Sequence, residues 1–238
     1  MLVTSPVDIC NLALLRINQN TIASMDAGPG DSTMAQFCRL VYDHARVSLL
    51  SVYNWTFAIR NERLDFAPGR LPIPPEPTEN MTWEEREEQS AAVQAFLQEQ
   101  AHHRTTRGFA NEYLLPENYL RLISVRDPQG RTLVAQEGME PVFALEGGRL
   151  WSNRTQLYMR FVGDVTEVSL FPPSFTECLV IDMAIRLTKK FNDSTTYLQQ
   201  LQQESALTLS AAMANDCQQT MLSGIQSYPL LVSTWDFG

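Results

Sequence analysis

Residues 174–223 read SFTECLVIDMAIRLTKKFNDSTTYLQQLQQESALTLSAAMANDCQQTMLS, and this stretch sets the fold class of the chain. The stretch contains neither glycine nor proline, and its apolar residues recur at helical spacing. This pattern predicts a helix over about 173–191 and a second over about 195–222. The first has a broad apolar surface and should lie at the centre of a bundle. The second has only a thin stripe, which indicates partial exposure or packing against another subunit; the stripe is Leu198, Leu201, Leu209 and Ala212.

Two more helices are predicted near the N-terminus. Ser5, Pro6 and Asp8 are typical of a helix start, with serine as the N-cap and proline at the first helical position. After a turn cluster over 26–31, apolar residues at steps of three or four predict a second helix over about 32–53. We expect these two helices to pair as a hairpin.

The pattern then changes to that of strands. Residues 54–59 alternate large apolar side chains with smaller ones, which predicts a short strand with Trp55, Phe57 and Ile59 on one side. Core packing is the expected role of these aromatic rings, and stacking of a ligand base is the alternative. From Tyr113 onward the period is two, and turn signals predict two hairpins and a fifth strand in one small antiparallel sheet. These strands cover residues 119–126, 131–134, 142–145, 149–152 and 156–162.

An insertion interrupts the strands. Five of the 13 prolines lie between Pro68 and Pro77, which favours extended chain. Thr82 and Glu85 then form a capping box for a helix running to about His103. The predicted fold class is therefore α+β, a mainly helical bundle with a small antiparallel β domain. Its parts are a helical hairpin and strand over 1–60, the insertion over 61–112, the β domain over 113–171, the C-terminal helices over 172–223 and an extended tail over 224–238.

Composition limits the partners that the chain can bind. Its 238 residues carry 18 basic and 27 acidic side chains, a net charge of −9, so tight binding of duplex nucleic acid is not expected. Only Lys189 and Lys190 are lysines among the basic residues; the other 16 are arginine. Because arginine is enriched and lysine depleted at protein interfaces, this bias indicates that the chain assembles with other protein subunits. No apolar stretch approaches about 20 residues and no export signal is visible, so we expect a soluble protein without a membrane span.

The sequence nominates no catalytic residue, cofactor or metal site. It contains no glycine-rich phosphate loop and no nucleophile-elbow or zinc-protease motif. The cysteines are widely separated and lack zinc-ligand spacing, so reduced and mostly buried thiols are expected. They are Cys10, Cys38, Cys178 and Cys217.

Three other features invite a chemical interpretation. His102 and His103 are adjacent on a predicted helix and point about 100° apart, so they do not easily share a ligand. His44 has no nucleophile motif beside it and is interpreted as a helix-surface histidine. The acidic run over 84–88 is interpreted as a solvated helix face, because a calcium site needs a turning loop with glycine. An enzyme such as an unrecognised hydrolase would also need a pocket with convergent polar groups.

Several short motifs follow one another in a particular order. The first helix contains Asp8-Ile9-Cys10-Asn11-Leu12-Ala13-Leu14, and the second carries Tyr42 and Arg46 shortly before Asn54-Trp55-Thr56-Phe57-Ala58. Tyr113-Leu114-Leu115-Pro116-Glu117-Asn118-Tyr119-Leu120-Arg121 opens the sheet, and residues 173–191 lead into the last helices. In this order, outside residues 68–110, the chain resembles the head-to-tail adaptor proteins of short-tailed bacteriophages, the family also called tail tubular protein A. The motif positions singled out are Asn11, Trp55, Phe57, Leu115, Pro116, Leu120 and Arg121.

The resemblance implies a structural virion protein without catalytic residues, assembled as a twelve-subunit ring. In the family this ring lies between the portal at the capsid vertex and the tail nozzle, a tail tubular protein B-like component, and often supports tail fibres or spikes. DNA passes through its channel without specific binding, and an acidic wall would repel phosphates within a Debye length of about 8 Å. The chain is then expected at the connector of the virion, after assembly in the host cytoplasm. The insertion over 61–112 departs from the compact form of the family.

The tail is apolar and aromatic, yet too short to form a core of its own. We predict that it docks onto the portal, and the alternative is that it folds back on its own domain. The predicted docking residues are Leu230, Leu231, Val232, Trp235 and Phe237. A non-enzymatic helical interaction or regulatory protein, unrelated to virions, explains the lack of catalytic motifs equally well and remains the second interpretation.

Overall fold

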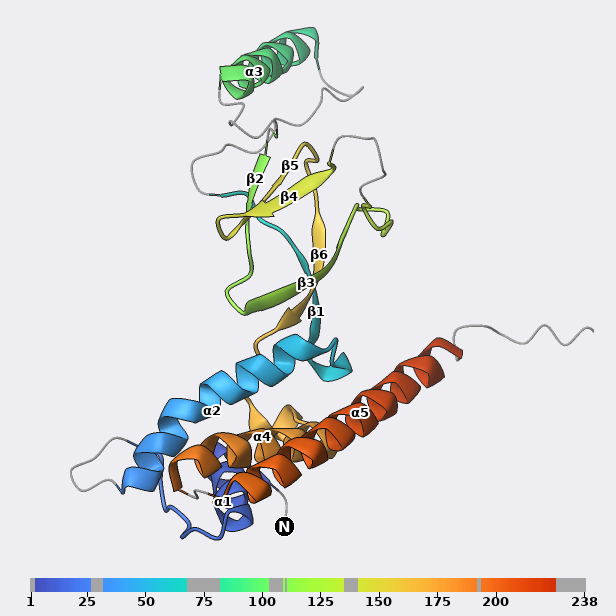
Figure 1. The fold of residues 1–238 in the computed structure, drawn as a ribbon. Coiled ribbons are helices and arrows are strands. Elements are labelled where there is room, and N and C mark those ends of the chain that lie inside the picture. The colour runs from blue at the N-terminus through green and yellow to red at the C-terminus, as the bar shows by residue number, and fades with distance from the viewer. Residues whose placement is uncertain are drawn as a thin grey trace, which may run out of the picture. The chain divides into compact units, whose positions relative to one another are not determined.

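The computed structural model describes residues 3–26, 32–67, 82–102, 109, 111–134, 141–191 and 194–225. The chain forms two compact units, which Figure 1 shows as ribbons: a helical unit of residues 1–59 and 162–238, and a β unit of residues 60–161. The described residues contain five α-helices and two three-stranded sheets, so the α+β fold class is confirmed. The predicted tail over 224–238 lies outside the described residues from position 226 onward.

The first two helices begin where local chemistry predicts. In front of α1 (Pro6–Arg16), the Ser5 hydroxyl accepts the amide N–H of Asp8, and the Asp8 carboxylate accepts the amide N–H of Ser5 at 3.0 Å. This reciprocal capping box satisfies amide groups that the first turn leaves unpaired. Before α2 (Thr33–Val52), the Ser32 hydroxyl accepts the amide N–H of Ala35 at 3.1 Å.

Helix α4 (Pro173–Phe191) is the centre of the helical unit, as its broad apolar surface predicts. It packs against α1, α2 and α5 (Thr195–Ile225). The predicted hairpin of α1 and α2 is wrong in one respect: each packs mainly against α4, and they touch each other at few positions. The reason is that α4 offers apolar side chains in several directions, and two helices can bury their faces on it.

The segment after α2 differs from the predicted strand over 54–59. A single 3-10 turn, η1 (Thr56–Ala58), comes first, and β1 (Ile59–Arg63) begins only after it. Thr56 donates its backbone N–H and its hydroxyl to the Asp216 carboxylate of α5, at 3.1 and 2.9 Å. Since these groups are bonded to a helix, they are not available to a neighbouring strand.

The β unit contains two sheets where one was predicted. One has the strand order β1-β6-β3 and the other β2-β5-β4, and the second includes β2, for which no strand was predicted. Both sheets contribute to one hydrophobic core. In the β4–β5 hairpin the turn is Gly147-Gly148 with φ of 60° and 72°, a left-handed geometry that glycine adopts without strain. The strands are β2 (Asn111–Leu114), β3 (Tyr119–Arg126), β4 (Phe143–Glu146), β5 (Arg149–Ser152) and β6 (Tyr158–Gly163).

The boundaries of the β unit also differ from the predicted ones. The β unit ends at Phe161, ten residues before the predicted end of the β domain at 171, and the chain re-enters the helical unit at Val162. Most of β1 belongs to the β unit and β2 lies wholly within it, so the insertion is shorter than the predicted 61–112. Its helix, α3 (Trp83–His102), has the predicted extent and the predicted capping box, in which Glu85 accepts the Thr82 amide N–H at 2.9 Å. The proline-rich residues 68–81 lie outside the described residues.

Candidate functional site

In the helical unit, the motif residues serve as a framework. The Asn11 side chain on α1 donates to the carbonyl of Ile22 at 3.0 Å and accepts the amide N–H of the same residue at 2.8 Å. One side chain thereby satisfies both backbone groups of a buried residue in the loop that follows α1. Asn11 therefore fixes the path of this loop.

Arg46 on α2 joins that helix to the segment where the chain re-enters the unit. Its guanidinium is buried, pairs with the Asp164 carboxylate and donates to the carbonyl of Val165 at 2.9 Å. A more exposed partner, Asp43, accepts at 3.3 Å. Burial lowers the pKa of Arg46, but the hydrogen bonds that its guanidinium donates to these carboxylates outweigh this effect and hold the pKa above its usual value.

An aromatic cluster joins the end of α2 to α4. Trp55 is 1% exposed, donates its indole N–H to the carbonyl of Leu49 at 2.9 Å and meets the ring of Phe175 edge-on. Phe57 packs against Phe171 and Phe175. Both predicted aromatic positions thus lie among other aromatic rings, which supports the core interpretation over ligand stacking.

The remaining motif residues lie in the β unit. Leu115 packs against its core, and the carbonyl of Pro116 accepts the amide N–H of Tyr119 at 3.0 Å, which closes the turn into β3. Leu120 and Arg121 are half-buried on β3. The five predicted portal-docking residues, Leu230, Leu231, Val232, Trp235 and Phe237, lie outside the described residues.

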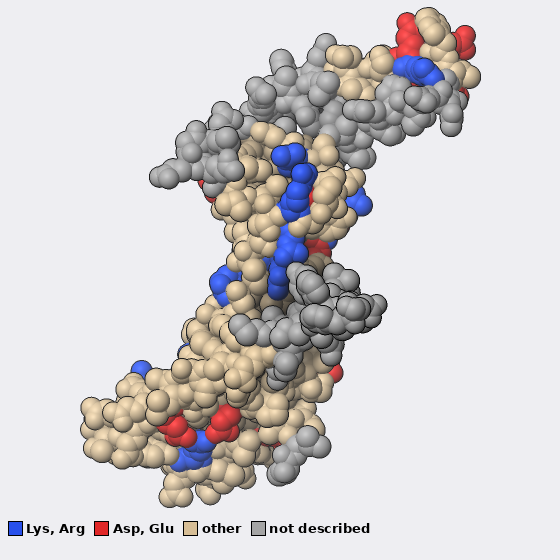
Figure 2. All heavy atoms as spheres, turned by 90° about the vertical axis from the view of Figure 1, so that its right-hand side faces the viewer, with Lys and Arg blue, Asp and Glu red and all other residues tan. Residues whose placement is uncertain are grey.

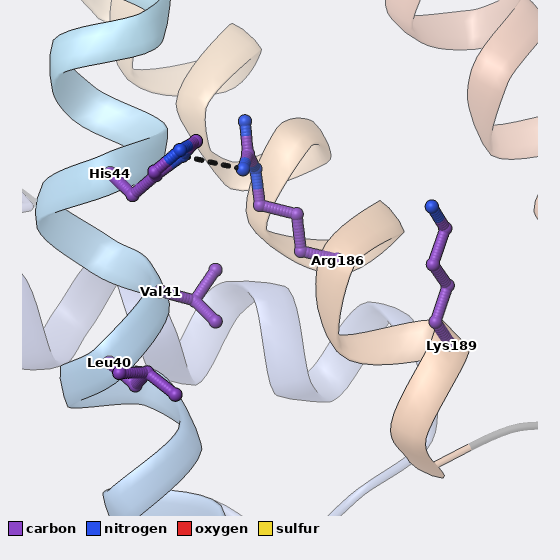
Figure 3. Close-up of a pocket in the computed structure, with 5 residues that line it drawn as sticks. All are labelled: Leu40, Val41, His44, Arg186 and Lys189. Carbon is purple, nitrogen blue, oxygen red and sulfur yellow. Dashed lines mark hydrogen bonds between the residues drawn. The ribbon is translucent and has the colours of Figure 1, made fainter.

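An open groove of about 430 Å³ runs between α2 and α4 (Figure 3). Leu40, Val41 and His44 line it from α2, and Arg186 and Lys189 line it from α4. Leu40 is 74% exposed, so the α2 side of the groove presents an apolar side chain to solvent. We call this site the α2/α4 groove.

The polar groups of the α2/α4 groove are positively charged or neutral. Arg186 Nη1 lies 2.8 Å from His44 Nδ1, and because a guanidinium only donates, the ring nitrogen is the acceptor of this hydrogen bond. Arg186 also pairs through Nε with Asp182 at 2.8 Å. Lys189 is exposed and has no hydrogen bond or ion pair with another described residue, and Lys190 lies over the ring of Phe37. The groove thus combines an apolar wall with cations, a chemistry suited to a partner that offers apolar and carboxylate groups.

The arginines are distributed unevenly. Twelve of the 16 lie within residues 60–161, and Figure 2 shows basic side chains gathered in a column on one face of the β unit. Among them, Arg131 pairs with Asp127 and Arg149 pairs with Glu112. Six are strand residues: Arg60, Arg63, Arg121, Arg126, Arg149 and Arg160.

The cysteines are free thiols. Cys10, Cys38 and Cys178 are buried as expected, whereas Cys217 on α5 is exposed. Burial raises the pKa of the Cys178 thiol to about 11. Because the thiolate is the reactive form, this buried thiol is unreactive near neutral pH.

Three candidates from the sequence remain: the acidic run of α3, His44, and the pair His102 and His103. Glu84, Glu85, Glu87 and Glu88 are all exposed on α3, which agrees with a solvated helix face. His44 is exposed as predicted, yet it takes part in the groove. The side chains of His102 and His103 lie outside the described part of the chain.

The α2/α4 groove was not predicted from the sequence. Two signals mark it in retrospect: both lysines of the chain fall at the end of one helix, and Leu40 lies outside the apolar stripe of its own helix. Neither signal says which helices meet there. That pairing comes from the packing of α2 on α4.

No model of a known protein family matches the chain, and no curated protein is similar to it. Among the residues that the structure describes, no His, Cys, Asp and Glu side chains cluster in a group that could hold a metal ion. In the same residues, no helix is both long and apolar enough to cross a membrane.

Proposed function

We propose that the chain is a structural subunit of a head-to-tail adaptor ring, which joins the portal of a short-tailed bacteriophage to its tail nozzle and leaves a channel for DNA. The observation that carries this proposal is a pair of exposed leucines on different helices, Leu40 on α2 at 74% and Leu207 on α5 at 75% exposure. A head-to-tail ring needs two different surfaces on each subunit. Covering both leucines with neighbouring subunits would remove their apolar surface from water, which favours such contacts.

The role of the motif residues supports a structural subunit. Asn11, Arg46 and Trp55 direct polar groups to backbone carbonyls of their own unit. These interactions stabilise the positions of α1, α2 and the connecting loops. A rigid helical unit is what a ring subunit needs in order to present its surfaces in a repeated geometry.

The distribution of charge supports passage of DNA without binding. Residues 1–59 and 162–238 carry 12 acidic and 6 basic side chains, whereas residues 60–161 carry 15 and 12. Acidic residues therefore make up a larger share of the charged residues in the helical unit than in the β unit. An acidic wall repels phosphates at short range and lets a duplex slide.

The ring is tested by imaging the purified full chain in negative stain, alone and mixed with the portal. We expect rings in at least the second sample. Small assemblies that ignore the portal under both conditions would overturn the proposal and favour the non-enzymatic interaction or regulatory protein instead.

Variants connect this test to the two exposed leucines. Leu40→Glu and Leu207→Glu should each reduce ring formation by about 10-fold or more, because each puts a charge at an apolar contact. Gln202→Glu adds the same charge at an exposed position of α5 that lies five residues from Leu207, on a different side of the helix, and should leave ring formation unchanged. Far-UV circular dichroism checks that all three variants keep their helices.

Portal docking by the tail is a separate part of the proposal. Deletion of residues 227–238 should abolish capture of the portal in a pull-down, since it removes Leu230, Leu231, Val232, Trp235 and Phe237. Unchanged capture would refute this role of the tail and leave the ring untouched.

A further inference from the structure

Helix α3 lacks the packing that normally stabilises a helix of its length. It spans 20 residues, and none of its side chains described, those of 83–91 and 93–95, is buried. Short helices in water are marginal without an apolar face packed on a neighbour. The side of α3 that is most covered carries Gln89 and Val93, and both are only half-buried.

The opposite side of α3 presents an exposed acidic and aromatic surface. Trp83 is 75% exposed, and Glu84, Glu87 and Glu88 are exposed without a hydrogen bond or ion pair to another described residue. Positions three and four apart lie on the same side of a helix, so these four residues share one side. We call this set the acidic face of α3.

The α2/α4 groove is the complement of that face. Arg186, Lys189 and Lys190 fall within five positions of α4 and make up half of the six basic residues of the helical unit. Arg186 and Lys189 line the groove together with the exposed Leu40, and Lys190 lies over the ring of Phe37. Each surface therefore combines one large exposed apolar side chain with several charges, and the two sets of charges have opposite sign.

We propose that the acidic face of α3 in one copy of the chain docks into the α2/α4 groove of a second copy. In this arrangement Trp83 covers Leu40 and Val41, and the carboxylates of Glu87 and Glu88 pair with Lys189 and Arg186. The occupant is a second copy of this chain, because the acidic face supplies the aromatic ring and the carboxylates that complement Leu40 and the cations of the groove.

Chain length permits this exchange between copies. The 14 residues 68–81 separate α3 and its cap from Ala67, and a chain of that length reaches at most about 50 Å. The two surfaces belong to different units, so each copy offers one and accepts the other. Such a contact is head-to-tail and closes into a ring when the rotation between copies allows it. The inference rests on the proposed ring for this geometry and names the surfaces that form it.

Crosslinking between copies tests the contact directly. Leu40→Cys and Trp83→Cys are made separately in a Cys217→Ser background, which removes the exposed native thiol, and the two proteins are mixed with a short bismaleimide. We expect a mixed dimer in at least about 10-fold excess over either protein crosslinked to itself, because only the mixture places the two thiols together. Absence of the mixed dimer would overturn the proposal. In a third protein that carries both cysteines in one chain, crosslinks that form only within single chains would overturn it too.

Charge reversal distinguishes loss of this contact from unfolding, because an unfolded variant would not regain self-association when the opposite charge is also reversed. Glu87→Lys or Lys189→Glu should each weaken self-association about 10-fold in sedimentation velocity, and the two combined should restore most of it. Glu117→Lys makes the same kind of change at an exposed position of the β unit and should have no effect. Failure of the combined variant to recover association would contradict the pairing of these surfaces.

The outcomes separate this inference from the proposed function. Mixed crosslinks without rings in the presence of the portal would support the α3 contact and refute the adaptor ring. Rings without mixed crosslinks would support the adaptor ring and refute the α3 contact.

Discussion

Replacement of Arg46 by methionine tests whether the helical unit is held together as described. Arg46 is the buried cation that connects α2 to the point where the chain returns from the β unit, through Asp164 and the carbonyl of Val165. Methionine keeps most of the aliphatic volume of arginine, so the change removes the charge and the hydrogen bonds and leaves little cavity.

The expected loss of stability follows from the groups left behind. Removing one partner of a buried ion pair typically costs about 3–5 kcal/mol, because the other charge stays uncompensated. The side chain of Asp164 is 28% exposed, so water solvates part of its charge and the lower end of that range applies. We expect the free energy of unfolding to fall by about 3 kcal/mol, which lowers the Tm of a chain of this size by about 6–12 °C.

Urea denaturation followed at 222 nm measures this change, because four of the five helices lie in the helical unit. Arg16→Met is the matched control: its carboxylate partners Glu177 and Glu204 are 48% and 45% exposed, so no buried charge is left behind and each pair should be worth less than about 1 kcal/mol. The double variant Arg46→Met with Asp164→Leu should regain at least about 1 kcal/mol over Arg46→Met alone, since no charge is then left unpaired.

The reasoning would be refuted if Arg46→Met and Arg16→Met lowered the urea midpoint equally. It would also be refuted if the double variant were less stable than Arg46→Met alone. The first result would mean that the Arg46 pair behaves as a surface pair. The second would mean that packing, rather than an unpaired carboxylate, causes the loss.

Three further predictions concern single side chains. Asn11→Ala should lower the free energy of unfolding by about 2 kcal/mol, because both backbone groups of Ile22 lose their partner. Asn11→Asp keeps an acceptor for the Ile22 amide N–H and should lower the free energy of unfolding by less. Equal urea midpoints for Asn11→Ala and the wild type would contradict this role of Asn11. In native protein a thiol reagent should label Cys217 rapidly and the buried cysteines only after unfolding, so a rapid phase that survives Cys217→Ser would be inconsistent with the burial described. Burial raises the pKa of Tyr42 to about 12, so as pH rises the unfolded chain loses this proton before the folded chain does. The free energy of unfolding should therefore fall between about pH 10 and pH 12, which urea midpoints measure while absorbance at 295 nm follows the ionisation of tyrosine. Tyr42→Phe should reduce the dependence of the urea midpoint on pH.

Helix positions were predictable because helix ends are local. The capping groups of Ser5 with Asp8 and of Thr82 with Glu85 lie three residues apart, and the glycine- and proline-free stretch leaves nothing to interrupt α4 within its length. Core positions of α4 followed from the same periodicity. In each case the deciding interactions join residues within a few positions of one another.

Strand pairing was less predictable. A strand over 54–59 has the right pattern, yet Thr56 bonds instead to Asp216, 160 residues further along the chain. The second sheet pairs β2 with β5, so that Tyr113 faces Leu150 in register. No local pattern states which of two distant segments will supply the partner of a backbone group.

The candidate site shows the same division. The sequence by itself determined the helices, the net charge of −9, the bias to arginine and the placing of both lysines at the end of one helix. Only the tertiary structure decided that Leu40 and His44 meet Arg186 and Lys189 across a groove, and that Trp83 stays exposed beside its carboxylates. The physical reason is that composition and capping depend on neighbours in the chain, whereas burial depends on which surfaces remain after distant segments have packed.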